Sequence, residues 1–161
     1  MTKISISEKK DLRKGFNSSE SINKIVVARG NPQASLMIIG EAPGAKEEEV
    51  GQPFVGRSGK LLDKLLQNSG IDTHQDVYFC NVVKCRPPKN RRPTKIEIQE
   101  NLPWLYQQIK LVNPRIIVLL GATALEAILK IKSRISFFRG KWIDWEGKLV
   151  MPVFHPSYLL R

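Results

Sequence analysis

Three separate segments of the sequence carry residue types that could act together on a nucleobase. GEAPG contains the carboxylate of Glu41, an apolar run ends near the carboxamide of Asn81, and HPSYLLR begins with the imidazole of His155. A carboxamide can pair with both a carbonyl oxygen and an imino hydrogen of a pyrimidine. An imidazole can donate to an oxygen that gains negative charge, and a carboxylate can position water or stabilise a cationic sugar. The set fits cleavage of a base from its deoxyribose.

An aromatic side chain lies close to the first of these segments. Phe54 could stack on the same base, an interaction worth about 1–3 kcal/mol. Structural explanations also exist: Phe54 could fill the core, Asn81 could cap a turn, and a lone histidine is more often structural. The acidic run 47–49 fits a solvated helix start or loop. No GxxxxGK[ST] motif occurs, which disfavours a nucleoside triphosphate site.

Positive charge is densest in the loop that follows Asn81. Six cations and no acid occur there within twelve residues: Lys84, Arg86, Lys89, Arg91, Arg92 and Lys95. The whole chain holds 26 Lys and Arg against 15 Asp and Glu, a net charge of +11, so its surface should attract polyanions. A run of cations is usually only a solvated face. Beside the candidate site, it predicts a track for backbone phosphates.

Four short apolar runs predict the strands that position these segments. They span residues 35–40, 77–83, 115–121 and 149–155, and each is short enough for a strand buried on both faces. In a parallel sheet, ligands bind beyond the carboxyl ends of the strands. The loops that carry Glu41, Asn81 and His155 follow three of these strands, so we expect them to meet at one edge.

Helical patterns separate the strand candidates. Leucines at helical spacing over 61–66 precede Gly70, and a shorter helix is expected over 125–129. Thr94 and Glu97 form a possible capping box for a helix that extends to Val112, in which Pro103 predicts a kink or break. Strands that alternate with helices imply a mostly parallel sheet covered on both faces. Residues 141–150 predict a hairpin that turns at residues 146–147.

Length and composition favour one soluble domain. The chain has 161 residues and no apolar run near the roughly 20 residues that span a bilayer. Its first 30 residues are polar and aperiodic, which predicts an N-terminal arm over 1–30 and a domain over 31–161. That segment is too polar for a secretory signal, so we expect a cytoplasmic location. A monomer is the default expectation. Cys80 and Cys85 are expected to be reduced thiols.

Three of the loops together resemble one known family. GEAPG followed by GQPFVGRSG, then YFCNVVKCRPPKNR, then HPSYLLR is similar to the family-four uracil-DNA glycosylases, the bacterial and archaeal iron-sulfur type. The resemblance runs from about Gly30 to the last residue. It implies an α/β fold, a three-layer α/β/α sandwich around a four-stranded mostly parallel sheet. It also implies removal of uracil from DNA, single- or double-stranded, after the nucleotide is flipped out.

The resemblance also implies roles for individual residues. Three positions are candidates for catalysis: Glu41, His155 and, more weakly, Glu47. Four positions are expected to contact the uracil: Gly40, Ala42, Phe54 and Asn81. With the basic loop, five positions are expected to contact DNA: Arg86, Arg91, Ser157, Leu159 and Arg161. Residues 159–161 would fill the gap that the flipped base leaves. Many relatives carry aspartate where Ala42 stands, which leaves open how Glu41 acts.

The sequence departs from this family at its iron-sulfur cluster. The resemblance implies four cysteine ligands, and only Cys85 matches one of them. Asn101 stands where the last ligand would be, and the segment before the GNP motif has no cysteine. One thiolate cannot hold such a cluster, so we predict that this chain has lost it and uses no metal or other cofactor. The basic loop and the N-terminal arm would then be held by packing alone.

Two functions are compatible with these residues. The first is a uracil-DNA glycosylase that hydrolyses the N-glycosidic bond and so initiates base excision repair. The second is a catalytically weak or inactive relative that binds uracil or damaged DNA. An RNA-binding protein is disfavoured because the sequence has neither an RNP-like aromatic strand nor a GXXG clamp.

Overall fold

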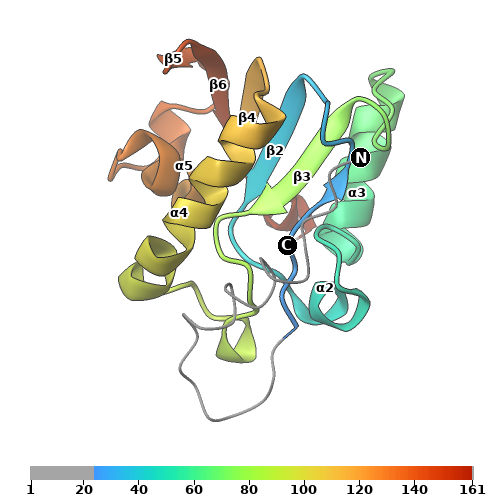
Figure 1. The fold of residues 1–161 in the computed structure, drawn as a ribbon, viewed down its shortest axis with the longest axis vertical. Helices are drawn as coiled ribbons and strands as arrows, with labels where there is room; N and C mark the ends of the chain where they lie inside the picture. The colour runs from blue at the N-terminus through green and yellow to red at the C-terminus, as the bar shows by residue number, and fades with distance from the viewer. Residues whose placement is uncertain (1–23, 161) are drawn as a thin grey trace.

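A mixed six-stranded sheet forms the centre of the molecule. The computed structural model describes residues 24–160, so residues 1–23 of the expected arm and Arg161 lie outside the described part. The sheet has the order β1-β3-β2-β4-β6-β5 (Figure 1). Its four central strands are mutually parallel and confirm the four predicted ones: β3 (Val77–Asn81), β2 (Leu36–Gly40), β4 (Ile116–Leu120) and β6 (Lys148–Val153).

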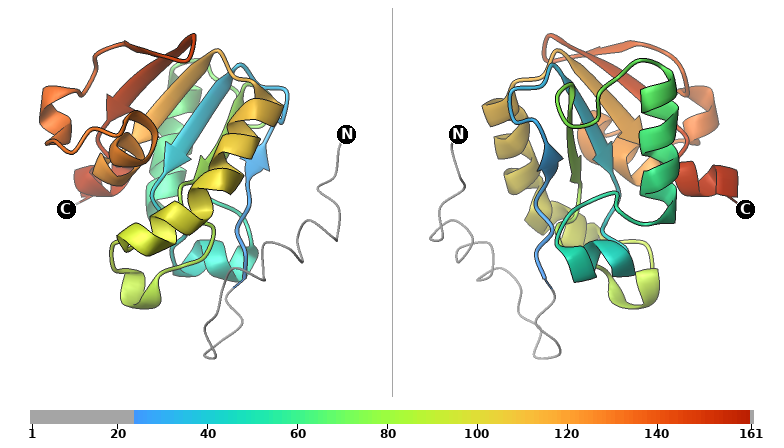
Figure 2. Two further views of the ribbon diagram at one scale, coloured as in Figure 1. Left: turned by 60° about the vertical axis from the view of Figure 1, so that its left-hand side comes forward. Right: turned by 90° about the vertical axis from the view of Figure 1, so that its right-hand side faces the viewer.

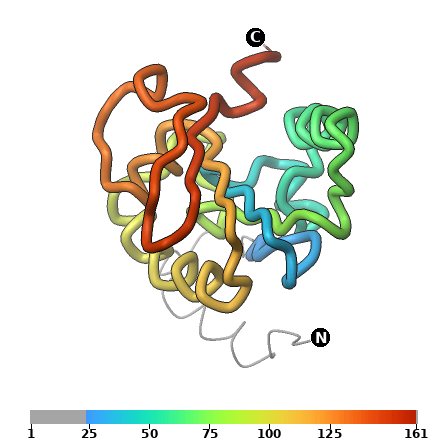
Figure 3. Tube along the Cα trace, turned by 90° about the horizontal axis from the view of Figure 1, so that it is seen from above, coloured from blue at the N-terminus to red at the C-terminus, as the bar shows by residue number. Residues whose placement is uncertain are grey.

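Two short antiparallel strands extend the sheet beyond the expected four. β1 (Arg29–Gly30) pairs with β3 at one edge, and β5 (Ile143–Trp145) pairs with β6 at the other. The hairpin between β5 and β6 turns at Glu146 and Gly147, as predicted. Both turn residues have positive φ, 52° and 73°, which suits the right-handed twist of a two-residue hairpin. Figure 3 shows this hairpin on the opposite side of the molecule from the helix over residues 57–68.

Helices cover both faces of the sheet (Figure 2), which confirms the three layers. Leu105 and Ile109 pack on one face together with Ile128, whereas Leu62 and Phe54 pack on the other. The α-helices are α2 (Ala45–Val50), α3 (Arg57–Asn68), α4 (Lys95–Val112) and α5 (Ala122–Leu129). Three short 3₁₀ helices lie in the loops: η1 (Pro88–Asn90), η2 (Ile135–Phe137) and η3 (Pro156–Leu160).

The central strand β2 contributes to both hydrophobic layers. Met37 and Ile39 belong to the core under α4 and α5, whereas Ile38 belongs to the core under α3. Successive side chains of a strand point to opposite faces, so a continuous apolar run is required where both faces are covered. The apolar run over residues 35–40 therefore reflects a strand buried on both sides.

Helix α4 begins as the sequence predicts and continues through its proline. Thr94 accepts from the Glu97 amide, and the Glu97 carboxylate accepts in return from the Thr94 amide. Of the kink or break expected at Pro103, the break does not occur, since α4 runs to Val112. A proline removes one backbone donor, and here the burial of Leu105 against the sheet holds the following turns in place.

Part of the expected N-terminal arm is packed on the domain. Val26 is fully buried, its amide donates to the Lys84 carbonyl, and β1 joins the sheet. Residues 24–30 are therefore part of the folded unit. Within residues 24–160, no helix combines the length and the apolar character needed to cross a membrane.

Candidate active site

The three predicted loops meet at the carboxyl edge of the parallel strands. Gly40 at the end of β2 is in register with Asn81 at the end of β3. The amide of Gly121, which follows β4, donates to the Val153 carbonyl at the end of β6, two residues before His155. The topology therefore brings Gly40, Asn81 and His155 to one rim, as expected for a parallel sheet.

Asn81 and Phe54 converge directly over Gly40. A Cβ atom placed on Gly40 would lie 2.5 Å from Asn81 Oδ1 and 2.6 Å from Phe54 Cζ, closer than side chains tolerate. The rings of Phe54 and His155 stack with their centroids 6.5 Å apart and their planes 28° apart. Phe54 therefore meets the Asn81 carboxamide over Gly40, and its ring stacks on the His155 imidazole. Asn81 is 2% exposed, so its orientation is fixed by the protein.

Phe54 adopts a backbone conformation that needs support. Its φ is 57°, in the left-handed region, which costs a non-glycine residue about 1–2 kcal/mol. The Glu47 carboxylate accepts from the amides of Val55 at 3.1 Å and Gly56 at 2.8 Å, immediately after this residue. Glu47 is only 9% exposed, which corrects the expectation of a solvated acidic run at this position. Its observed contacts hold the loop that carries Phe54.

Arg29 supports the same loop from the other side, and the sequence analysis did not identify it. It donates to the Pro53 carbonyl at 2.8 Å and to the Phe54 carbonyl at 3.3 Å. Asp63 on α3 pairs with its guanidinium at 2.6 Å, and the Phe79 ring lies 3.8 Å beneath it. An arginine in a strand of only two residues has no sequence signal of its own, so only the fold reveals this role.

His155 is oriented by the residue two positions further on. The Ser157 amide donates to His155 Nδ1 at 3.2 Å, and Ser157 Oγ lies 2.9 Å from the same nitrogen. Because Nδ1 accepts from the amide, the proton of the neutral ring lies on Nε2. Burial lowers the pKa of His155, and the charges of Glu41 and Glu47 oppose that shift only in part. A neutral imidazole with an Nε2–H donor is therefore the form present at neutral pH.

Glu41 is held by a buried threonine. Thr123, the second residue of α5 and 2% exposed, donates its hydroxyl hydrogen to the Glu41 carboxylate. The same hydroxyl accepts from Arg92 Nε at 3.1 Å, and Arg92 also pairs with Glu126 at 3.1 Å. Both hydrogen-bonding roles of the Thr123 hydroxyl are thereby used. A threonine two residues after the third predicted strand, at the same rim, was the available signal.

Lys84 lies inside the protein and not on a phosphate-facing surface, which corrects its expected place in the basic run. It is 2% exposed, and its ammonium donates to the backbone carbonyl of Asn81 and to Gln108 Oε1. Burial lowers the pKa of this amine. The contact to the Asn81 carbonyl fixes the end of β3, from which the Asn81 side chain projects.

The loop after β3 is held by buried hydrogen bonds as well as by packing. The Lys84 amide donates to Asn101 Oδ1 at 3.0 Å, and Asn101 Nδ2 donates to the Glu97 carbonyl at 2.8 Å. Gln108 Nε2 donates to the Val27 carbonyl at 3.1 Å. This network, Lys84 with Asn101 and Gln108, joins the loop to α4 and to residues 26–27. The expectation that packing alone would hold them is therefore wrong.

The cysteines do not fit an iron-sulfur cluster. The chain has two, and both are free thiols, Cys80 buried on β3 and Cys85 half-buried in the loop. Burial raises the pKa of Cys85 to about 11, which disfavours the thiolate that a metal requires. Asn101, at the expected position of another ligand, uses both polar atoms of its side chain in hydrogen bonds. In residues 24–160, no group of three or more His, Cys, Asp or Glu could hold a metal ion.

The expected DNA contacts differ in their surroundings. Arg86 pairs with Glu48 at 3.1 Å, and Arg91 forms two hydrogen bonds with Glu97 at 2.7 and 2.8 Å. This pairing lowers the pKa of Glu97 to about 2. Leu159 on η3 is 60% exposed, as a wedge requires.

Three further residues expected to contact the base or the DNA show no exposed contact group in the described part of the structure. Ser157 is half-buried and bonded to His155, and Ala42 packs against the core under α4 and α5. Arg161 lies outside the described residues, so no contact of its side chain can be assigned.

Comparison with known proteins agrees with the geometry of this rim. The sequence profile of the Uracil DNA glycosylase superfamily matches residues 27–161. The type-4 uracil-DNA glycosylase of Thermotoga maritima is 52% identical over 139 residues, which cover 85% of this chain and 72% of that protein. The type-4 enzyme of Pyrobaculum aerophilum is 38% identical over 146 residues, 84% of this chain and 73% of its own length.

A type-5 protein is also similar, over a smaller share of its length. The type-5 uracil-DNA glycosylase of Pyrobaculum aerophilum is 34% identical over 146 residues, which cover 81% of this chain and 64% of that protein. The profile match and the higher identities to the type-4 proteins lead to one assignment. This chain belongs to the uracil DNA glycosylase superfamily and, within it, to the type-4 family.

Proposed function

We propose that this protein is a uracil-DNA glycosylase that hydrolyses the N-glycosidic bond of a flipped-out deoxyuridine. The observation that carries the proposal is the convergence of Asn81 and Phe54 over Gly40, with His155 stacked on the Phe54 ring. In the reaction, the bond between C1′ and N1 breaks and its electron pair leaves with the base. A water oxygen bonds to C1′ and loses its proton. Free uracil and an abasic sugar are the products, and their formation initiates base excision repair.

Three side chains hold the base and stabilise its departure. Asn81 pairs with the edge of uracil, and Phe54 stacks on its face, which adds about 1–3 kcal/mol. The negative charge that leaves with N1 spreads onto the carbonyl oxygen, to which His155 Nε2 donates a hydrogen bond. Such preorganised donors typically contribute about a hundredfold to a thousandfold in rate. The backbone at Gly40 and Ala42 lines the same space.

Glu41 stabilises the sugar, which becomes cationic as the bond breaks. Its hydrogen bond from Thr123 holds the carboxylate in place, so little reorganisation is needed in the transition state. With Ala42 in place of an acid, Glu41 is the nearest carboxylate in sequence that could receive the proton of the attacking water. Glu47 supports the Phe54 loop, because both of the amides that follow Phe54 donate to it.

The reaction requires water and no cofactor, and we propose that this chain works without an iron-sulfur cluster. Two cysteines cannot supply four ligands, and the Lys84–Asn101–Gln108 network joins the segments that a cluster would join. DNA that contains uracil, single- or double-stranded, is the partner. Residues 159–161 fill the gap in the base stack, and the protein acts as a cytoplasmic monomer.

Release of free uracil from a uracil-containing oligonucleotide tests this function. Wild-type protein should release uracil, and His155→Ala should release it about a hundredfold to a thousandfold more slowly. Equal and negligible release by both proteins, with binding to uracil-containing DNA intact, would favour the alternative of an inactive relative that only binds DNA.

A further inference from the structure

Three exposed cations near the predicted DNA contacts have no charged partner among the described residues. Arg86 and Arg91 both pair with acids of their own chain. By contrast, Lys95, Lys132 and Arg134 are exposed and form no salt bridge or side-chain hydrogen bond with other described residues. Two of these three lie in the loop after α5, to which the sequence analysis gave no function.

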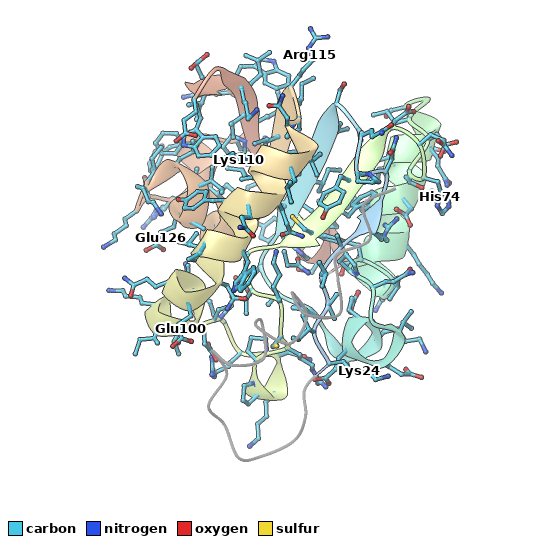
Figure 4. The ribbon with its side chains drawn as sticks, viewed as in Figure 1. Lys24, His74, Glu100, Lys110, Arg115 and Glu126 are labelled. Atoms are coloured by element: carbon cyan, nitrogen blue, oxygen red, sulfur yellow. The ribbon has the colours of Figure 1, made fainter. Side chains whose placement is uncertain are left out.

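These cations border a single hollow in the surface. The hollow has a volume of about 420 Å³ and lies between the N-terminal end of α4, the outer side of α5 and the loop 131–134. Four of its lining residues are cationic: Arg92, Lys95, Lys132 and Arg134. Glu126 is the one acid among the lining residues, and it is already paired with Arg92. Figure 4 labels Glu126 on α5. Three positive charges therefore face the hollow without a counter-charge.

The hollow is connected to the candidate catalytic carboxylate. Arg92 lines it and donates to Thr123, which in turn donates to Glu41. Ala122, another lining residue, follows Gly121 at the rim of the site. Two hydrogen bonds thus separate the hollow from the place where the deoxyribose is expected.

We infer that this hollow binds a backbone phosphate of the DNA strand that carries the uracil. The inference rests on the proposed function, which brings a continuous polyanion to this rim. A single strand carries one negative charge per about 3.4 Å of helix axis, so phosphates continue past the flipped nucleotide. The free cations Lys95, Lys132 and Arg134 meet this phosphate, and arginine can bind it with two parallel hydrogen bonds. Arg92 remains with Thr123, so phosphate binding leaves Glu41 in position.

Equilibrium binding to two oligonucleotides of different length tests the inference. Both carry a 2′-fluoro deoxyuridine, which resists cleavage; one extends well beyond the uridine on both sides, and the other stops at its immediate neighbours. Lys132→Ala/Arg134→Ala should bind the long single strand about tenfold more weakly at low salt. For this strand, the slope of log K against log salt should become shallower by about 0.7 for each lost contact. Affinity for the short strand should be unchanged.

A matched pair of cations at the other end of the molecule provides the control. Lys110 and Arg115 are exposed, and Arg115 lies directly before β4, at the edge opposite the candidate site (Figure 4). Lys110→Ala/Arg115→Ala removes the same charge and should leave both affinities and the salt slope nearly unchanged. Lys95→Ala gives an independent variant on a different element, and it should lower the affinity for the long strand alone.

Three results would overturn the inference. The first is an equal loss of affinity for the long strand in Lys132→Ala/Arg134→Ala and in the control variant. The second is an equal loss of affinity of Lys132→Ala/Arg134→Ala for the long and the short strand. The third is no loss of its affinity for either strand. Release of uracil by the wild-type protein from the unmodified long and short strands is measured alongside. If the wild type releases uracil while Lys132→Ala/Arg134→Ala binds DNA as tightly as the control variant, the phosphate site in the hollow is wrong and the glycosylase function stands. If the wild type releases none from any substrate, the proposed function fails first.

Discussion

At the scale of single residues, the site depends on protonation and orientation as much as on residue type. His155 accepts from the Ser157 amide through Nδ1, which leaves the proton of the neutral ring on Nε2. Phe54 lies in a left-handed conformation that Glu47 and Arg29 stabilise. The types of Glu41, Asn81 and His155 were sufficient to suggest a nucleobase reaction. The contacts that orient them come from Thr123, Lys84 and Ser157.

The protonation of His155 gives a pH-dependent prediction. Because burial lowers its pKa, the titration midpoint of this imidazole in the folded protein should lie below the ordinary value of about 6.5. Folding favours the neutral form, so this contribution to stability is full above pH 6.5 and is lost as the pH falls through the lowered pKa. NMR titration of the histidine ring resonances measures the midpoint. A midpoint above the ordinary value would contradict the neutral-donor role.

Variants of Glu47 separate structural support from proton transfer. Glu47→Ala leaves the Val55 and Gly56 amides without their acceptor and should lower the free energy of unfolding by about 1–3 kcal/mol. Glu47→Gln keeps an oxygen acceptor, so it should retain most of the stability and most of kcat. Urea unfolding and uracil-release kinetics are the measurements. If Glu47→Gln lost kcat as completely as Glu47→Ala while remaining stable, Glu47 would be an assisting acid after all.

At the scale of elements, the end of β3 and the loop after it are fixed by buried polar groups. Lys84 bonds to the Asn81 carbonyl, and Asn101 on α4 bonds to the Lys84 amide. Fully satisfied buried networks of this kind make a segment rigid, and an incomplete one is costly. Because the Asn81 side chain projects from this point, a change in α4 should alter both stability and recognition of the base.

The effect of α4 on the site can be measured with one buried and one exposed substitution. Asn101→Ala removes the acceptor of the Lys84 amide and should destabilise the protein by about 1–3 kcal/mol. It should also raise KM for uracil-containing DNA, because the Asn81 end of β3 is less well held. The neighbouring residue Glu100 is exposed on the same helix, and Glu100→Ala should change little (Figure 4). Equal effects of the two substitutions on stability would contradict the importance of the network.

The elements that the sequence predicted are those with strong periodicity or a clear end signal. The four central strands, α4 with its capping box and the turn at residues 146–147 were all found. β1 has two residues and α2 has six, too few to show a period. Pro103 predicted a kink or a break, and the burial of Leu105 helps α4 to continue through it without a break. The burial of Glu47 and Lys84 could not be predicted, because their partners are backbone groups and distant side chains that the fold brings to them.

At the scale of the whole molecule, the candidate catalytic carboxylate and the exposed cations without partners among the described residues lie at different sites on the surface. Glu41 lies at the rim with its carboxylate held by Thr123, where a sugar becomes cationic. The exposed cations Lys95, Lys132 and Arg134 surround a hollow on the flank. A net charge of +11 favours association with DNA of any sequence. The Glu41 carboxylate then acts only at the reacting nucleotide.

The protein is expected to fold and to release uracil without bound iron. The chain's only cysteines are Cys80, buried in the core, and Cys85, whose thiol has a pKa raised to about 11. At neutral pH neither is readily available as a thiolate, and hydrogen bonds from Asn101 and Gln108 already join the segments around them. Protein purified without added iron should contain much less than one iron per chain, and a chelator should change neither its melting temperature nor its rate of uracil release. Stoichiometric iron by elemental analysis, or unfolding on chelation, would mean that ligands outside residues 24–160 or from a second chain complete a metal site.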